Sequence, residues 1–248
     1  MNLPDPAAVP LLPRAILAVA TVAILAGAGC TAPDEFGENV IAIDDPGGAL
    51  QGRETAIHAV LTATLEAVYP TLPITGVTIT LRPDPAQAIG GYGAGGVTPD
   101  ARTVHLFLDP SFPTLDEVIA QRLGPLLAHE LHHAIRWRNP GYGATLFEAM
   151  ISEGLADHFA VETLGVPAPP WSDGFGRDST AYYLALARPE FDSRSYDHSA
   201  WFFDTSPTLP RWTGYTLGFR LVETYLAAHP GATAAQLVDT PAPSFRPE

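Results

Sequence analysis

Three histidines lie within five residues of one segment of the chain, LLAHELHHAIRWRNPGYGATLFEAMISEGLADHFA at 126–160, which also contains four carboxylic acids. Within it, His129, Glu130 and His133 form the pattern H-E-x-x-H. Positions i and i+4 lie on one face of a helix, so the two imidazoles can bind a single zinc ion. Glu130, beside the first imidazole, can act as general base for a metal-activated water. The spacing therefore predicts a zinc-dependent hydrolytic site.

A second group of acids supplies the rest of such a site. A catalytic zinc ion takes three protein ligands and keeps one position open. Glu153 follows His133 after about 20 residues, which leaves room for a turn and a second helix that doubles back, so Glu153 is the predicted third ligand. Asp157 lies one helical turn further on, where its carboxylate can hold the outer nitrogen of a ligand histidine.

Other residues of the segment are weaker candidates. Glu148 has no acid four residues later, which makes it a poorer third ligand. His132 could pair with His129 at i, i+3, but this pairing would leave His133 without a role, so we expect His132 on the helix surface. Arg136 stands where the extended metzincin motif needs glycine, which excludes that class.

These motifs resemble those of a known group. H-E-x-x-H followed after about 20 residues by E-x-x-x-D is similar to the gluzincin pattern of thermolysin-like metallopeptidases, and HELHHAIR and SEGLADHFA resemble a bacterial family of predicted zinc-dependent proteases. The resemblance covers roughly 76–229 and implies a zincin-like fold, a Zn²⁺ cofactor and peptide or protein substrates. By position it implies that the zinc ligands are His129, His133 and Glu153. It also implies that Glu130 is the general base and Asp157 the supporting carboxylate.

The resemblance also implies two further parts of the site. Gluzincins stabilise the oxyanion with a tyrosine or histidine from a later helix. Tyr215 is the predicted residue because it follows Gly214 near the start of the last predicted helix, and Tyr142 and His198 are alternatives. In the same group a strand before the first motif helix borders the peptide-binding cleft, and TVHLFLD at 103–109 stands in that place.

The composition restricts the partners and the stabilising chemistry. The chain of 248 residues has 27 acidic and 13 basic residues and a net charge of −14, and every basic residue is arginine. Nucleic-acid binding needs clustered cations, so we expect no nucleic-acid partner. The single cysteine, Cys30, has no partner for an intrachain disulfide, so stability must come from the core.

The N-terminus has the features of an export signal. An apolar run at 15–29 is short for a membrane span and ends in small residues before Cys30. This arrangement resembles a bacterial lipobox, in which the cysteine is lipidated, although Gly27 stands where leucine is usual. We expect a lipoprotein-type signal peptide at 1–29, a tether at 30–48 and a protein secreted across the inner membrane and anchored by lipid in a bacterial cell envelope. An ordinary signal peptide and an uncleaved anchor are the alternatives.

Hydrophobic periodicity predicts the elements that position the site. Helices are expected at 49–69, at 114–138 with an interruption at Gly124 and Pro125, at 144–165 and at 213–229, with short helices near 180–188. Alternation predicts strands at 76–82 and 103–109, and the five glycines between them predict a flexible loop at 88–102 that borders the cleft.

Together these features predict an α+β, zincin-like domain at 49–248, dominated by helices, with a small antiparallel sheet flanking the active-site helix. The predicted function is that of a gluzincin-like zinc peptidase. The alternative is a non-catalytic lipoprotein that uses a zincin-like fold as a binding module. No sequence feature identifies a specificity pocket.

Overall fold

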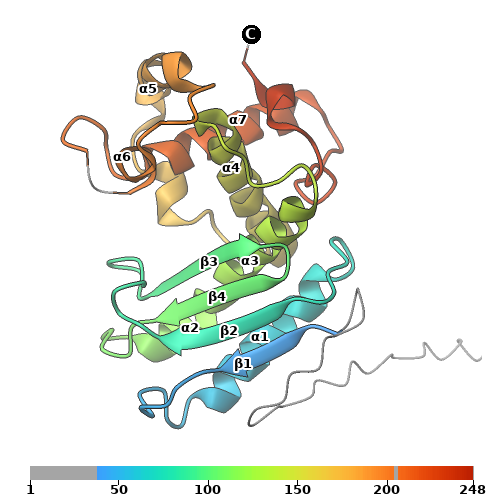
Figure 1. Ribbon diagram of the computed structural model, residues 1–248, viewed down its shortest axis with the longest axis vertical. Coiled ribbons are helices and arrows are strands. Elements are labelled where there is room, and N and C mark those ends of the chain that lie inside the picture. Colours follow the sequence, from blue (N-terminus) through green and yellow to red (C-terminus); the bar gives the residue numbers. More distant parts are fainter. Residues whose placement is uncertain (1–37, 204–205, 248) are drawn as a thin grey trace, which may run out of the picture.

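The computed structural model describes residues 38–203 and 206–247, which form a sheet backed by helices and a second, largely helical part beside it (Figure 1). The strands are β1 Val40–Ile43, β2 Thr78–Pro83, β3 Ala94–Asp100 and β4 Thr103–Leu108. The helices are α1 Glu54–Val68, α2 Leu115–Gln121, α3 Leu123–Arg138, α4 Leu146–Leu164, α5 Thr180–Ala187, α6 His198–Phe202 and α7 Thr213–Ala228. The predicted α+β class is confirmed.

The sheet has the strand order β1-β2-β4-β3. β1 pairs with β2 and β2 with β4 in parallel, whereas β3 pairs with β4 in antiparallel orientation. The sheet is therefore mixed and not antiparallel as expected. The reason is that α1 crosses over between β1 and β2, which lets the two strands run in the same direction, while a tight hairpin joins β3 to β4.

The first strand lies inside the segment predicted to be a tether. Val40 donates its backbone N–H to the carbonyl of Val77 at 2.9 Å, and β1 pairs with β2 from this residue on. The folded domain therefore begins before residue 49. The predicted signal peptide at 1–29 and Cys30 lie outside the described residues. Within the described ranges, no helix is long and apolar enough to cross a membrane.

Helix α3 connects the sheet to the helical part. It packs against β3, β4 and α1 on one side and against α4 on the other. Its side chains Leu127, Leu131 and Ala134 have no exposed surface. The interruption before α3 falls at Arg122, slightly earlier than predicted. Pro125 then occupies the first turn, where backbone N–H groups have no acceptor within the helix.

Helix α4 is closed at both ends by its own sequence. The Thr145 side chain accepts from the backbone N–H of Glu148, and Glu148 accepts from the backbone of Thr145, which together form a capping box. Gly165 ends the helix in the left-handed conformation at φ 64°, as predicted from its position. Glu148, the weaker candidate for third ligand, therefore serves as a helix cap.

The glycine-rich segment predicted to be a loop contains β3, an edge strand of the sheet. At two of its glycines an added β-carbon would displace a neighbouring group. A β-carbon on Gly95 would lie 2.2 Å from the carbonyl oxygen of Gln87, and one on Gly96 would lie 2.6 Å from Oε1 of Glu130. The expectation that TVHLFLD borders the cleft is wrong, because this segment forms the inner strand β4 and the edge beside α3 is β3. Glycine lowers strand propensity, so the sequence pattern predicts a loop here where the structure has a strand.

Candidate metal centre and active-site cleft

Helices α3 and α4 bring three side chains together in one buried group. Nε2 of His129 lies 2.9 Å from Nε2 of His133, and Oε2 of Glu153 lies 3.1 and 3.3 Å from these two nitrogens. Each residue is at most 6% exposed. Two imidazole nitrogens and one carboxylate oxygen are the donor set of hydrolytic zinc sites, so the group fits zinc.

The charges within this group favour an ionised carboxylate. Burial would raise the pKa of Glu153, but His133 and His129 hold it well below its usual range through their charges and hydrogen bonds. Burial has the opposite effect on the imidazole and would lower the pKa of His129, but Asp157 and Glu153 raise this pKa well above its usual value. Glu153 is therefore in the form that binds a cation.

We call His129, His133 and Glu153 the metal group. Asp157 connects this metal group to the segment that follows α4. Its Oδ1 lies 2.8 Å from Nδ1 of His129, which must donate because a carboxylate only accepts. This bond leaves Nε2 of His129 as the nitrogen that faces the group. Asp157 also accepts from the indole N–H of Trp171 at 3.0 Å and from the Ser172 hydroxyl at 2.8 Å.

Tyr142 lies behind Glu153. Its hydroxyl donates to Oε1 of Glu153 at 2.6 Å, so the two carboxylate oxygens have different partners. Burial, followed by the charge of Glu153, raises the pKa of Tyr142 well above its usual value, which keeps the donor protonated. Tyr142 was an alternative for stabilising an oxyanion, but the structure places its hydroxyl on the third member of the metal group.

Glu130 lies against the edge strand. The Thr98 hydroxyl of β3 donates to Oε2 of Glu130 at 2.7 Å and also lies 3.0 Å from its backbone carbonyl. Gly96 of the same strand leaves space for the other carboxylate oxygen. Burial raises the pKa of Glu130, and the charges of His129 and His133 partly oppose this. A carboxylate with a raised pKa is suited to accept and return a proton.

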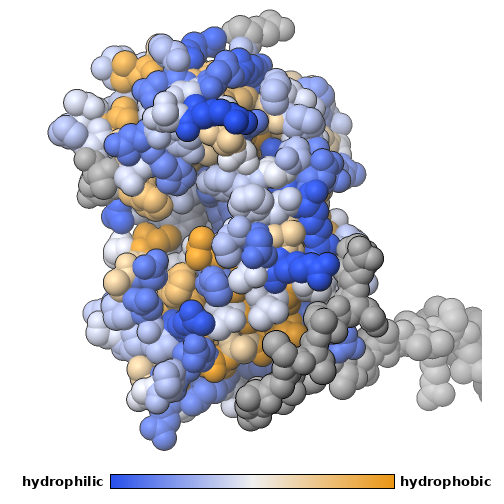
Figure 2. All heavy atoms as spheres, viewed as in Figure 1, coloured by the Kyte–Doolittle hydropathy of each residue, from blue (hydrophilic) through white to orange (hydrophobic). Residues whose placement is uncertain are grey.

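A cleft of about 280 Å³ opens beside His129 and Glu130. Its other lining residues come from the segment around β3, from α3, from the turn after α4 and from the chain before and at the start of α7: Ala86, Gln87, Ala88, Ile89, Gly90, Gly96, Leu126, Trp171, Phe203, Arg211, Trp212 and Tyr215. On the face shown in Figure 2, apolar side chains gather at the boundary between the sheet and the helical part. The mixture of apolar walls and a few polar groups is typical of a ligand site.

The candidates for oxyanion stabilisation lie at different places. Tyr215, near the start of α7, lines the cleft, and its pKa is raised well above its usual value by burial and then by the charge of Glu153. His198 at the start of α6 stacks on Phe202 and lies 3.0 Å from the Tyr196 hydroxyl, outside the set of cleft-lining residues. Of the two, only Tyr215 lines the cleft with Glu130.

Several contributors to the site carry no signal in the sequence. Thr98, Trp171, Ser172 and Arg211 come from connecting or edge segments with no fixed spacing from the histidine motif. The paired glycines at 95–96 are a signal that could have pointed to a close approach of the backbone, although the sequence pattern favours a loop there. His132, expected on the helix surface, is completely buried, where its ring packs against Phe159.

The fold and the buried group of two histidines and a glutamate define a metal-dependent class of protein with a zinc-type donor set. A family model described as Predicted Zn-dependent protease (DUF2268) matches residues 58–246, which is most of the chain. The chain therefore belongs to this family, and the prediction of a zinc-protease family and of a zinc cofactor is confirmed. A search of the curated proteins found no match.

Proposed function

We propose that this protein is a zinc peptidase of the gluzincin type that hydrolyses peptide bonds in peptides or proteins. The observation that carries the proposal is the position of Glu130, which lines the same cleft as His129 and lies next to the group of His129, His133 and Glu153. A site that only bound metal would have no need of a buried, ionisable carboxylate at the cleft.

His129, His133 and Glu153 are the proposed zinc ligands, and Asp157 orients His129. When bound, zinc lowers the pKa of a water molecule to about 7 and polarises a carbonyl group. Glu130 takes the proton of the attacking water and passes it to the leaving amine. The hydrogen bond from Thr98 holds the carboxylate in place for both transfers.

Tyr215 is the proposed donor to the oxyanion. It lies in the wall of the cleft, and its raised pKa keeps the hydroxyl protonated and able to donate. Trp171 and Phe202 pack around its ring, at centroid distances of 6.3 and 5.2 Å. Such packing restricts the rotamers of the side chain and so fixes the direction of the hydroxyl.

The edge strand β3 is the proposed binding surface for the substrate backbone. An extended peptide can add to the free edge of a sheet through main-chain hydrogen bonds. Gly96 keeps a side chain away from the Glu130 carboxylate, and Thr98 connects the strand to Glu130. The substrate bond would then lie beside the general base.

We also propose that Cys30 carries a lipid that anchors the protein in the cell envelope, because it follows the apolar run at 15–29. Cys30→Ala would then release the protein from the membrane fraction. Mass spectrometry of a mature protein whose N-terminus lies elsewhere and bears no lipid would contradict this proposal.

The principal test separates a peptidase from a binding module with the same fold. Glu130→Gln removes the general base but none of the zinc ligands, so we expect normal zinc content and a loss of about 10² to 10⁴ in the rate of peptide cleavage. The measurement is cleavage of a broad peptide library by both proteins, with zinc determined by elemental analysis. Equal rates for zinc-loaded wild type and variant would rule out the mechanism, and no cleavage by either would favour the binding module.

The matched control for the metal is His133→Ala. This variant should hold far less than one zinc ion per chain because it removes one of three ligands. Zinc content unchanged by His133→Ala would overturn the assignment of the ligands, whatever the result for Glu130→Gln.

A further inference from the structure

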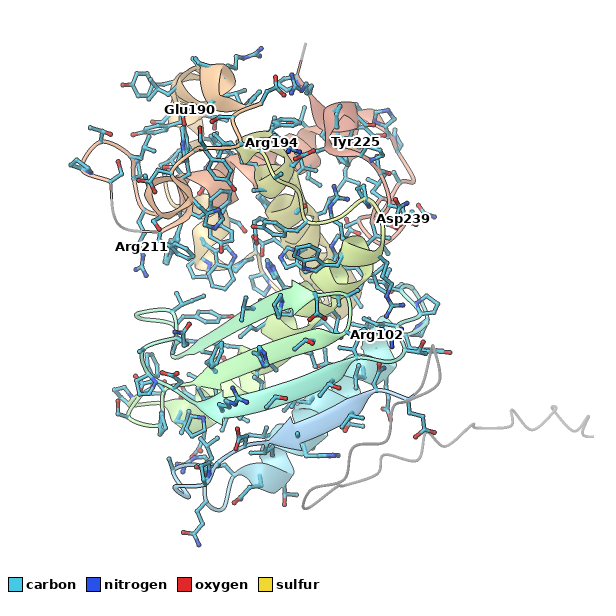
Figure 3. The ribbon with its side chains drawn as sticks, in the orientation of Figure 1. Arg102, Glu190, Arg194, Arg211, Tyr225 and Asp239 are labelled. Carbon is cyan, nitrogen blue, oxygen red and sulfur yellow. The ribbon has the colours of Figure 1, made fainter. Side chains whose placement is uncertain are left out.

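Arg211 lies at the boundary between the helical part and the sheet, in the segment that leads into α7 (Figure 3). It lines the cleft together with Glu130. Its guanidinium carbon lies 4.1 Å from the ring centre of Trp212. Nη2 lies 3.8 Å from the position that a β-carbon would take on Gly90, across the cleft. The guanidinium group therefore has one face against an aromatic ring and its donors in the cleft.

The charge of Arg211 has no partner among the described residues. Five other arginines form ion pairs with carboxylates: Arg53, Arg82, Arg177, Arg220 and Arg246. The Arg211 side chain forms no ion pair or hydrogen bond with any residue at 38–203 or 206–247. Arg122 and Arg136 also form no ion pair among the described residues, but both donate to backbone carbonyl oxygens. Arg211 is half-buried and has neither kind of acceptor there, in a chain with a net charge of −14.

Arg211 is also not the counter-ion of the general base. The charges that lower the pKa of Glu130 come from His129 and His133. The residue that supports Arg211 is held in a strained conformation, because Trp212 has φ 66°, the one positive value at a non-glycine position among the described residues. Strained backbone often persists where a binding site requires it.

We propose that Arg211 binds a carboxylate group of the substrate, and that this enzyme prefers peptides with an acidic group near the scissile bond. The inference rests on the proposed peptidase function. A guanidinium group can hold a carboxylate with two parallel hydrogen bonds, and the apolar walls around it strengthen a charged contact. Ile89, Leu126 and Trp171 line the same cleft and can cover the apolar part of the bound residue.

The carboxylate can come from an aspartate or glutamate side chain or from the C-terminus of a peptide. Short synthetic peptides distinguish the two sources. In each pair one peptide has glutamate where the other has glutamine, and every peptide is made both with a free and with an amidated C-terminus. Binding is measured by calorimetry on the zinc-loaded full chain carrying Glu130→Gln, so that the peptides are not consumed. The same chain with Arg211→Gln added gives the comparison.

We expect the acidic member of a pair to bind about 10- to 100-fold more tightly than its neutral partner, and Arg211→Gln to remove this preference. Arg211→Lys should keep part of it, because the charge remains and the planar fork is lost. Arg82→Gln is the matched control: it removes the same charge from β2, outside the cleft, and should leave the preference unchanged.

Equal binding of acidic and neutral peptides by the Glu130→Gln chain in which Arg211 is intact overturns the inference. So does a preference that survives Arg211→Gln, since the carboxylate would then bind zinc or another group. The same peptides, offered to the zinc-loaded wild type, separate this inference from the proposed function. Cleavage without a preference for acidic peptides contradicts only the proposed role of Arg211. Binding that depends on Arg211 but is followed by no cleavage contradicts only the proposed peptidase activity.

Discussion

The two helices of the metal group and the walls of the cleft are built differently. Every residue of α4 from Ala149 to Ala160 is buried, and contacts between helices fix the three side chains that could hold a metal ion. The cleft walls come from loops and helix ends, and Phe203 is 49% exposed. Packing in the core therefore determines where a metal ion could be held, whereas surface segments that can change at little cost to stability would determine which ligand the cleft accepts.

The contact between α4 and α7 is the most extensive one between two elements of the described residues, and it should be the most sensitive to substitution. A β-carbon on Gly218 would lie 2.0 Å from the carbonyl oxygen of Met150, and one on Gly154 would lie 2.3 Å from the carbonyl of Gly218. Alanine normally stabilises a helix relative to glycine. We nevertheless expect Gly218→Ala to lower the free energy of unfolding by about 3 kcal/mol or more. The added β-carbon and the carbonyl oxygen that it meets are both attached to the backbone, so neither can rotate away from the other.

Urea denaturation of Gly218→Ala beside Gly176→Ala tests this prediction. Gly176 has nothing within 4 Å of an added β-carbon and an ordinary φ of −60°, so its variant should stay within about 0.5 kcal/mol of wild type. Similar unfolding free energies for both variants would show that the two helices are not in backbone contact.

Asp157 links the two regions, since one carboxylate holds His129 of α3 and Trp171 in the wall. We expect Asp157→Asn to weaken zinc binding by about 10- to 100-fold, because the amide cannot accept all the hydrogen bonds that the carboxylate accepts. Competition with a zinc chelator measures the effect. Asp178→Asn, an exposed residue outside the cleft, is the control, and equal affinities in the two variants would show that Asp157 does not support the metal group.

The same contrast explains what the sequence could predict. The histidines at i and i+4, the acid on the second helix and the caps at Thr145 and Gly165 are local patterns, so α3, α4 and the contact of His129 with Asp157 were predictable. The walls depend on which distant segments meet. β3 was missed because its glycines make room for Glu130 of α3 and for the backbone of Gln87 in the preceding loop, and no periodic pattern in the sequence shows these contacts. The direction of β2 depended on the crossover through α1, which alternation does not reveal.

The two glycines of β3 separate stability from activity within one strand. Gly95→Ala places a β-carbon against the backbone of Gln87, so the free energy of unfolding should fall by about 1 to 3 kcal/mol. Gly96→Ala places it against the end of the Glu130 side chain, which can move. We expect Gly96→Ala to keep zinc and stability near wild type but to lower kcat/KM for peptide cleavage by about tenfold or more, because the base is displaced. Loss of stability without loss of rate in Gly96→Ala would contradict the position of Glu130.

The smallest predicted effect is a pH dependence of the free energy of unfolding. It arises from His158, which lies where α4 packs against α7. His158 stacks on Phe219 at 3.9 Å and lies with Nε2 3.0 Å from its backbone carbonyl. Burial lowers the pKa of His158, which hydrogen bonding to Phe219 and the charge of Glu162 only partly offset. As the pH falls below the unfolded value of about 6.5, the unfolded chain takes up a proton that the folded chain does not. The free energy of unfolding should therefore decrease below that pH.

For one proton this slope is at most about 1.4 kcal/mol per pH unit. His158→Gln removes the titrating group while glutamine can still donate to the Phe219 carbonyl, so its unfolding free energy should fall less steeply between about pH 6.5 and pH 5. Denaturation of both proteins at the same free zinc concentration compares the slopes. Part of the slope should remain in the variant, because burial also lowers the pKa of His132 well below its usual value. Parallel profiles for wild type and variant would mean that His158 is equally easy to protonate in the folded and unfolded states, and that the crossing of α4 and α7 is more open to water than its packing indicates.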